Sequence, residues 1–114
     1  MASFKELIVW QKGLDLTMLI YTLSNELRRS EEYNLCSQMR RAALAIPSNI
    51  SEGHRRNNRK EFRQFCGIAL GSGAELDTQL IITSRVYPNI DVSGALKLCT
   101  EVQKMLNSLV AKLK

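Results

Sequence analysis

The sequence has few of the residues from which catalytic and metal sites are built. Its one histidine, His54, cannot by itself supply a histidine metal cluster or complete a histidine-containing triad within one chain. No helix offers the Glu-x-x-His pair of di-iron bundles, and no arginine lies four to six residues before His54, the spacing typical of helical-bundle ribonucleases of the HEPN type. The glycine-rich stretch GIALGSGAEL lacks the lysine of a P-loop. These absences predict a protein that is not an enzyme and needs no cofactor or metal.

Cysteine, proline and long apolar runs are scarce as well. The three cysteines lie far apart, which argues against a disulfide framework and favours buried thiols in a reducing compartment. The N-terminal MASFKELIVW has no apolar signal-peptide core, and no run approaches the roughly 18 apolar residues of a membrane span. With 2 prolines and 45% hydrophobic residues, the 114-residue chain is predicted to be one folded cytoplasmic domain, residues 1–114, with no membrane partner.

What the chain has in abundance is helical periodicity. Every long segment repeats apolar residues at helical spacing, and none alternates with period two. Short connections join four such segments, which predicts an all-α fold, an up-down-up-down antiparallel four-helix bundle. Aromatic residues are only 6% of the chain, as suits a helical core of Leu, Ile, Ala and Met.

The first segment, from about Phe4 to Leu27, carries two apolar stripes on nearly opposite sides. One stripe comprises Phe4, Leu7, Leu14, Met18 and Tyr21, and the other comprises Val9, Leu16, Ile20, Leu23 and Leu27. A helix at the corner of a single bundle can bury only one of them. The second stripe is therefore predicted to be the interface of a homo-oligomer, because monomers rarely expose such a patch.

Several residues suggest where helices begin, bend and end. Ser30 and Asp91 are predicted caps, and Asn58 with Glu61 resembles a capping box. Gly53 suits the left-handed position just beyond a helix end, and Pro47 predicts a kink. Three further glycines, at positions 67, 71 and 73, lie within a helical pattern and predict that another backbone approaches closely.

A line of polar residues runs beside the apolar stripe of the second and third segments. In an antiparallel hairpin, Arg41 falls within a turn of Glu75. A half-buried network is therefore predicted, with a solvated flank as the alternative. Its members are Gln38, Arg41, Asn49, Glu52, Glu75 and Gln79.

The densest positive charge lies in HRRNNRKEFR, between the second and third segments. The net charge is +5 and the pI about 9.4, which is compatible with an acidic partner. The basic tip is predicted to contact nucleic-acid phosphates and comprises Arg55, Arg56, Arg59, Lys60 and Arg63. A solvated loop that merely aids solubility is the alternative.

The whole pattern resembles the small four-helix bundle proteins encoded in intervening sequences of bacterial 23S rRNA genes. The resemblance is carried by VWQKG (residues 9–13), YNLCSQMRRAA (33–43), IPSNISEG (46–53), EFRQF (61–65) and GSGAELDTQL (71–80). SNISEG departs slightly from the commoner SNIAEG. The resemblance implies a closed homopentamer without known enzymatic activity. It also implies kinship with the accessory variability determinant proteins of diversity-generating retroelements, which bind nucleic acid and a reverse transcriptase.

Two functions of different classes follow. The first is a homopentameric protein that binds RNA or DNA by charge, without catalysis. The alternative is an oligomeric scaffold or adaptor for a partner protein, with no role in nucleic-acid binding. Salt-dependent binding to RNA distinguishes them.

Overall fold

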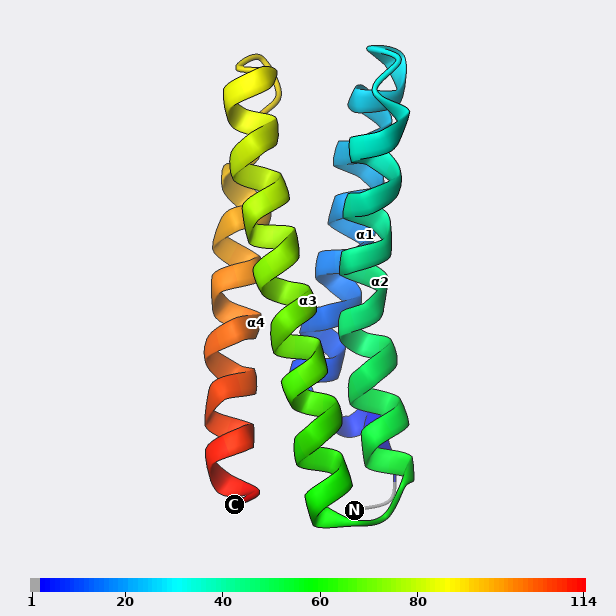
Figure 1. Ribbon diagram of the computed structural model, residues 1–114, viewed down its shortest axis with the longest axis vertical. Helices are drawn as coiled ribbons and strands as arrows, with labels where there is room; N and C mark the ends of the chain where they lie inside the picture. Colours follow the sequence, from blue (N-terminus) through cyan, green and yellow to red (C-terminus); the bar gives the residue numbers. More distant parts are fainter. Residues whose placement is uncertain (1–2) are drawn as a thin grey trace.

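The computed structural model describes residues 3–114, which form four long helices and no strand. A short 3-10 turn, Phe4–Glu6, precedes them. The helices are α1 (Ile8–Arg29), α2 (Tyr33–Arg55), α3 (Arg59–Val86) and α4 (Ser93–Lys112). They lie side by side in a body of 44 × 19 × 19 Å (Figure 1). The predicted all-α, four-helix fold is confirmed.

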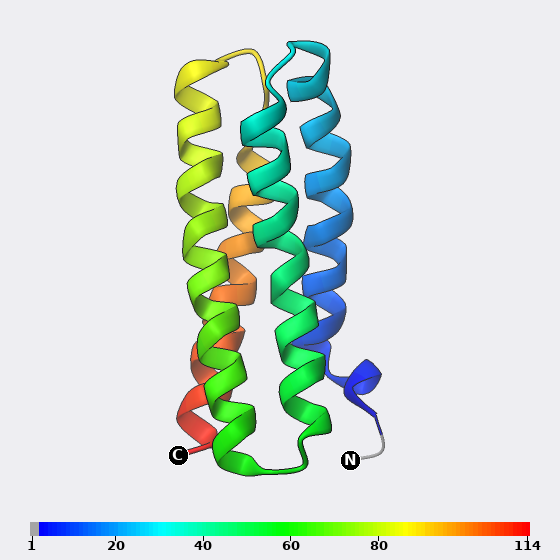
Figure 2. The same cartoon turned by 45° about the vertical axis from the view of Figure 1, so that its right-hand side comes forward.

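Each helix packs against two neighbours. α2 and α4 both contact α1, and both contact α3, so α1 and α3 lie diagonally across the bundle. The α1–α2 and α3–α4 connections lie at one end, whereas the α2–α3 connection, the start of α1 and the end of α4 lie at the other (Figure 2). None of the helices among the described residues is long and apolar enough to cross a membrane.

The prediction for the two stripes of α1 is wrong. The stripe assigned to an oligomer interface forms the core of its own chain, where its members are at most 7% exposed: Val9, Leu16, Ile20, Leu23 and Leu27. The other stripe faces outward, and Leu14, Met18 and Tyr21 are 39%, 69% and 40% exposed. The two stripes have similar composition, so periodicity alone does not tell which one the neighbouring helices cover.

Two predicted helix ends are also wrong. Gly53 lies inside α2 and is buried against α3. The two helices are so close here that a Cβ added at Gly53 would lie 2.6 Å from the Cβ of Phe65. The left-handed residue of this loop is Asn57, with φ of 53°. At the other end of α2 the cap is Glu32 rather than Ser30; a carboxylate oxygen of Glu32 accepts from the Leu35 backbone N–H at 3.4 Å.

The predicted cap at Asn58 is confirmed. Asn58 caps α3, its Oδ1 accepting from the Glu61 backbone N–H at 3.0 Å. Asp91, the predicted cap of α4, instead precedes the cap residue Val92; its carboxylate accepts from the backbone N–H of Ser93 at 3.0 Å. α2 continues through Pro47, whose buried ring lies beside Gly13 of α1.

Candidate nucleic-acid interface

The basic tip is the α2–α3 connection with the helix turns on either side of it. Arg55 ends α2, and after the turn at Asn57 the cap residue Asn58 starts α3. This geometry places Arg59 and Lys60 in the first turn of α3, where the helix dipole disfavours positive charge. The dipole of α3 therefore does not account for the positive charge at these two positions.

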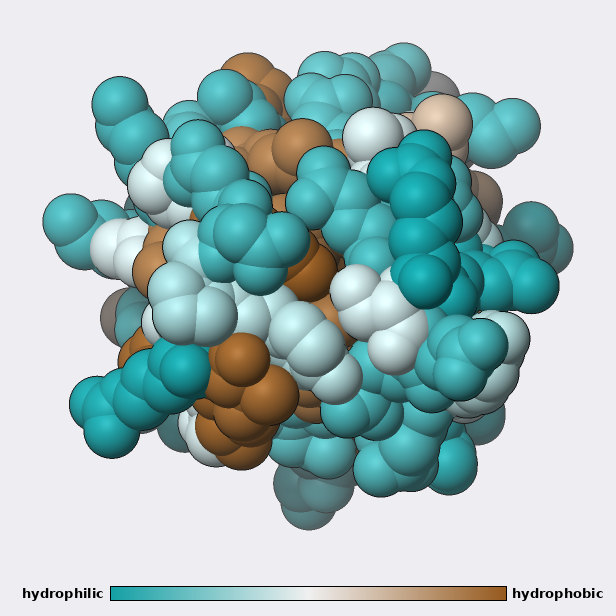
Figure 3. Space-filling model, turned by 90° about the horizontal axis from the view of Figure 1, so that it is seen from above, coloured by the Kyte–Doolittle hydropathy of each residue, from teal (hydrophilic) through white to brown (hydrophobic). Residues whose placement is uncertain are grey.

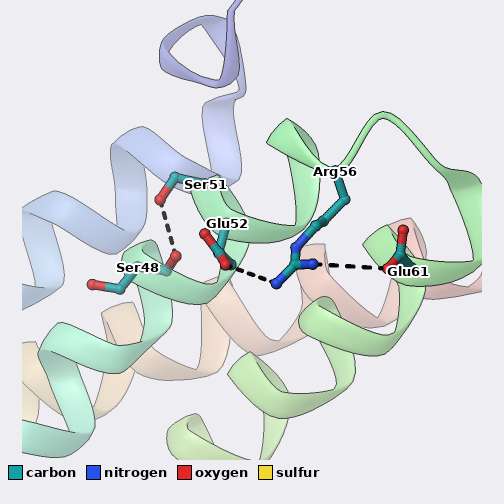
Figure 4. A network of polar contacts seen from close by, with 5 residues as sticks. All are labelled: Ser48, Ser51, Glu52, Arg56 and Glu61. Atoms are coloured by element: carbon teal, nitrogen blue, oxygen red, sulfur yellow. Dashed lines mark hydrogen bonds and ion pairs between the residues drawn. The ribbon is translucent and has the colours of Figure 1, made fainter.

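Arg56 is engaged within its own chain. Its guanidinium lies 3.0 Å from Oε1 of Glu52 and 4.0 Å from Oε1 of Glu61 (Figure 4). It also lies over the ring of Phe65, 5.1 Å from the centroid. Arg56 thus links the end of α2 to the start of α3, and its charge is offset by two carboxylates.

Arg59 joins the tip to the end of α4. Its guanidinium donates to the backbone carbonyl of Lys112, in the last turn of α4, where the helix dipole favours a cation. Arg59 and Leu113 also line one hollow of about 290 Å³. This contact places Lys112 beside the tip, and Lys114 follows two residues later in the chain. Lys112 is far from the tip in the sequence, so the sequence alone does not show this proximity.

Three tip residues have no ion pair or side-chain hydrogen bond among residues 3–114: Arg55, Lys60 and Arg63. All three are exposed, and Lys60 and Arg63 lie three residues apart on one side of α3. The nearby rings of Phe62 and Phe65 are half-buried, and Phe62 packs edge-on against His54. The tip therefore offers charge to phosphates and little aromatic surface to bases.

The predicted half-buried polar network does not form. Arg41 and Glu75 line one groove of about 330 Å³ between α2 and α3, together with Gln38 and Ser72. Arg41 and Glu75 are nevertheless both exposed, and the three ion pairs of residues 3–114 do not include them. The antiparallel register places the two side chains at the same groove without bringing their charges within 4 Å.

Of the remaining predicted members of the network, two have contacts elsewhere and one has an unmet acceptor. Asn49 donates to the Ala45 carbonyl at 2.7 Å within α2, and Glu52 pairs with Arg56 at the tip. The amide oxygen of Gln79 is buried and has no hydrogen-bond partner among residues 3–114.

No group of three His, Cys, Asp or Glu side chains within residues 3–114 could hold a metal ion. Cys36, Cys66 and Cys99 are buried as free thiols. Burial raises the pKa of the Cys66 thiol to about 11, so it is protonated and unreactive at neutral pH.

The comparisons with known proteins agree with this architecture. The sequence profile of the 23S rRNA-intervening sequence protein family matches residues 5–108. The chain belongs to this family. A similar solved structure is a protein of unknown function from the S23 ribosomal protein family of Bacteroides thetaiotaomicron. It is 25% identical, with a TM-score of 0.85 over 90% of this chain and 98% of that one. No curated protein matches the sequence.

Proposed function

We propose that this member of the 23S rRNA-intervening sequence family binds nucleic acid through the basic tip, without catalysis. The observation that carries the proposal is the set of exposed, unpaired cations Arg55, Lys60 and Arg63 beside the N-terminal end of α3. Both the cations and the helix end favour an anion there, and phosphate is the anion that nucleic acids present. The family description refers to 23S rRNA, so RNA is the first ligand to test.

The proposal includes a closed homo-oligomer of up-down-up-down bundles, with five copies implied by the family resemblance. The alternating ends of the helix connections support this helix order (Figure 2). The exposed apolar residues Leu14, Met18 and Tyr21 support self-association. A ring repeats the tip around its axis, so weak contacts of single tips add up by avidity.

The direct test reverses the three unpaired charges. R55E/K60E/R63E takes the formal net charge from +5 to −1, since three reversals remove six units. We expect this variant to lose RNA binding at low salt while its helicity and mass stay those of the parent.

The matched control is R85E/K97E/K104E, which reaches the same net charge by reversing exposed residues away from the tip. We expect it to bind RNA much as the parent does. Equal loss in both variants would mean that net charge alone drives binding. If the parent itself fails to bind at low salt, the tip is a solvated loop and a protein scaffold is the better function.

A further inference from the structure

The groove of about 330 Å³ between α2 and α3 lies well away from the basic tip. Arg41, on its α2 wall, is about 21 Å from Arg55 along the helix axis, given the rise per residue of an α-helix. The groove is nearer to the opposite end of the bundle, where most of the visible surface is hydrophilic (Figure 3). A ligand in this groove would therefore approach over a polar surface and leave the tip free.

The groove is open because small side chains form part of its wall. Ala42 and Ala45 line it on α2, and Ser72 lines it on α3. Larger side chains at these positions would fill the space, since protein interiors pack closely. The volume is at the lower end of the range for ligand pockets, so the groove suits an occupant of few atoms.

Ser72 brings an unpaired hydroxyl to the groove. The residue is only 8% exposed, and its hydroxyl makes no hydrogen bond among residues 3–114. The hydroxyls of Thr78 and Thr83, further along α3, instead donate to the carbonyls four residues earlier, at 2.9 and 2.8 Å. A largely buried polar group without a partner costs free energy, so the Ser72 hydroxyl favours an occupant that can bond to it.

Two opposite charges line the same groove from its two walls. Arg41 on α2 and Glu75 on α3 have no ion pair or side-chain hydrogen bond among residues 3–114. The neighbouring Arg40, by contrast, donates to Ser24 at 2.7 Å and to Asn25 at 2.9 Å. Arg41 is thus available to an anionic group and Glu75 to a cationic group of one ligand.

This pair of charges disfavours ligands that carry charge of one sign. A nucleic-acid strand would be attracted by Arg41 and repelled by Glu75, so the groove does not suit the ligand proposed for the tip. A small zwitterion is attracted by both charges at once.

We propose that the α2–α3 groove binds a free α-amino acid. Its carboxylate lies at Arg41 and its ammonium group at Glu75, while Ser72 offers a hydroxyl that can donate or accept. The two alanines leave room for a neutral side chain. The proposal is independent of the nucleic-acid function proposed for the tip.

The first test uses the parent protein alone. Titration calorimetry with each common L-α-amino acid that has a neutral side chain should show saturable binding for at least one of them. The amide of that amino acid lacks the carboxylate, and its N-acetyl derivative lacks the ammonium group. Each derivative should bind roughly fivefold more weakly, the upper range for one exposed ion pair. No saturable binding by any of the amino acids would overturn the proposal.

Variants then assign the two charges. Arg41→Gln should bind the amide at least as well as the amino acid, because the partner of the carboxylate is gone. Glu75→Gln should in the same way lose the preference over the N-acetyl derivative. A purely structural role of either residue would not produce this selective change. The matched controls Arg85→Gln and Glu26→Gln neutralise exposed charges outside the groove and should keep the preferences of the parent.

A charge swap completes the test. A zwitterion can bind in the reverse direction, so R41E/E75R should bind the amino acid, whereas R41E alone places two carboxylates at the groove and should not. A swap that binds no better than R41E, or neutral variants that keep the preferences of the parent, would overturn the proposal. The swap leaves the net charge at +5, so RNA binding at the tip should be unchanged and the two proposals can fail separately.

Discussion

At the scale of single residues, Gly53 decides how closely α2 and α3 pack. The sequence pattern predicts a helix end at Gly53. In the structure Gly53 lies within α2, and its lack of a side chain lets Phe65 of α3 pack against it. Gly53→Ala places a Cβ 2.6 Å from the Cβ of Phe65, an atom fixed close to the backbone, so the helices must separate. We expect a net loss of about 1 to 3 kcal/mol in the free energy of unfolding.

Urea denaturation checks this loss, with Gly94→Ala as the matched control. A Cβ at Gly94 meets nothing within 4 Å, so this variant should be neutral or slightly more stable. If Gly53→Ala is as stable as Gly94→Ala, the close approach of α3 at Gly53 is wrong.

Two buried thiols predict how stability varies at alkaline pH. Burial raises the pKa of Cys66 from 9.0 to about 11, and burial with the nearby Asp77 does the same for Cys99. The folded state therefore retains protons that the unfolded state releases, so this stabilisation is complete below pH 9 and is lost as pH rises toward 11. Urea denaturation across this range should show a steeper loss for the parent than for C66A/C99A. Parallel curves would contradict the buried positions of these thiols.

At the scale of helices, the sequence predicts the presence of each helix better than it predicts the residues at which the helix begins and ends. The periodicity of apolar residues predicts all four helices, because burying one face requires that spacing. Asn58 is predictable as a cap since its interaction with the Glu61 N–H is local. Ser30 fails as a cap because the chain makes one more turn, with Glu31 at φ of 61°, before α2 begins. That extra turn depends on where the α1–α2 hairpin packs, which the local sequence does not show.

The cap at Asn58 supports the start of α3 and therefore the placement of the tip. Asn58→Ala should lower the free energy of unfolding by about 1 kcal/mol, because the Glu61 N–H loses its acceptor. Asn58→Asp keeps an acceptor oxygen and should retain most of that stability. Thermal unfolding of both variants checks this, and an equal loss in the two would contradict the cap.

At the scale of the whole molecule, the sequence shows two apolar stripes on α1 but cannot rank them. Leu16 and Met18 are both good core residues, and only the positions of α2 and α4 bury one at 0% and leave the other 69% exposed. The basic tip is visible in the sequence as a run of cations. Arg56 pairs with Glu52 and Arg59 donates to the end of α4, whereas Arg55, Lys60 and Arg63 stay unpaired. This division depends on tertiary contacts that the run of cations does not show.

The central claim is that the tip binds nucleic-acid phosphates by charge. The most direct measurement is the salt dependence of RNA binding for the parent and for Lys60→Ala, which removes one unpaired cation. The parent should bind less tightly as salt rises, with a steep dependence, and the logarithmic slope of the variant should be flatter by roughly 0.7 to 0.9 for each phosphate that Lys60 neutralises in the parent. A parent that binds with no dependence on salt, or a variant whose slope equals that of the parent, would contradict binding by charge at the tip.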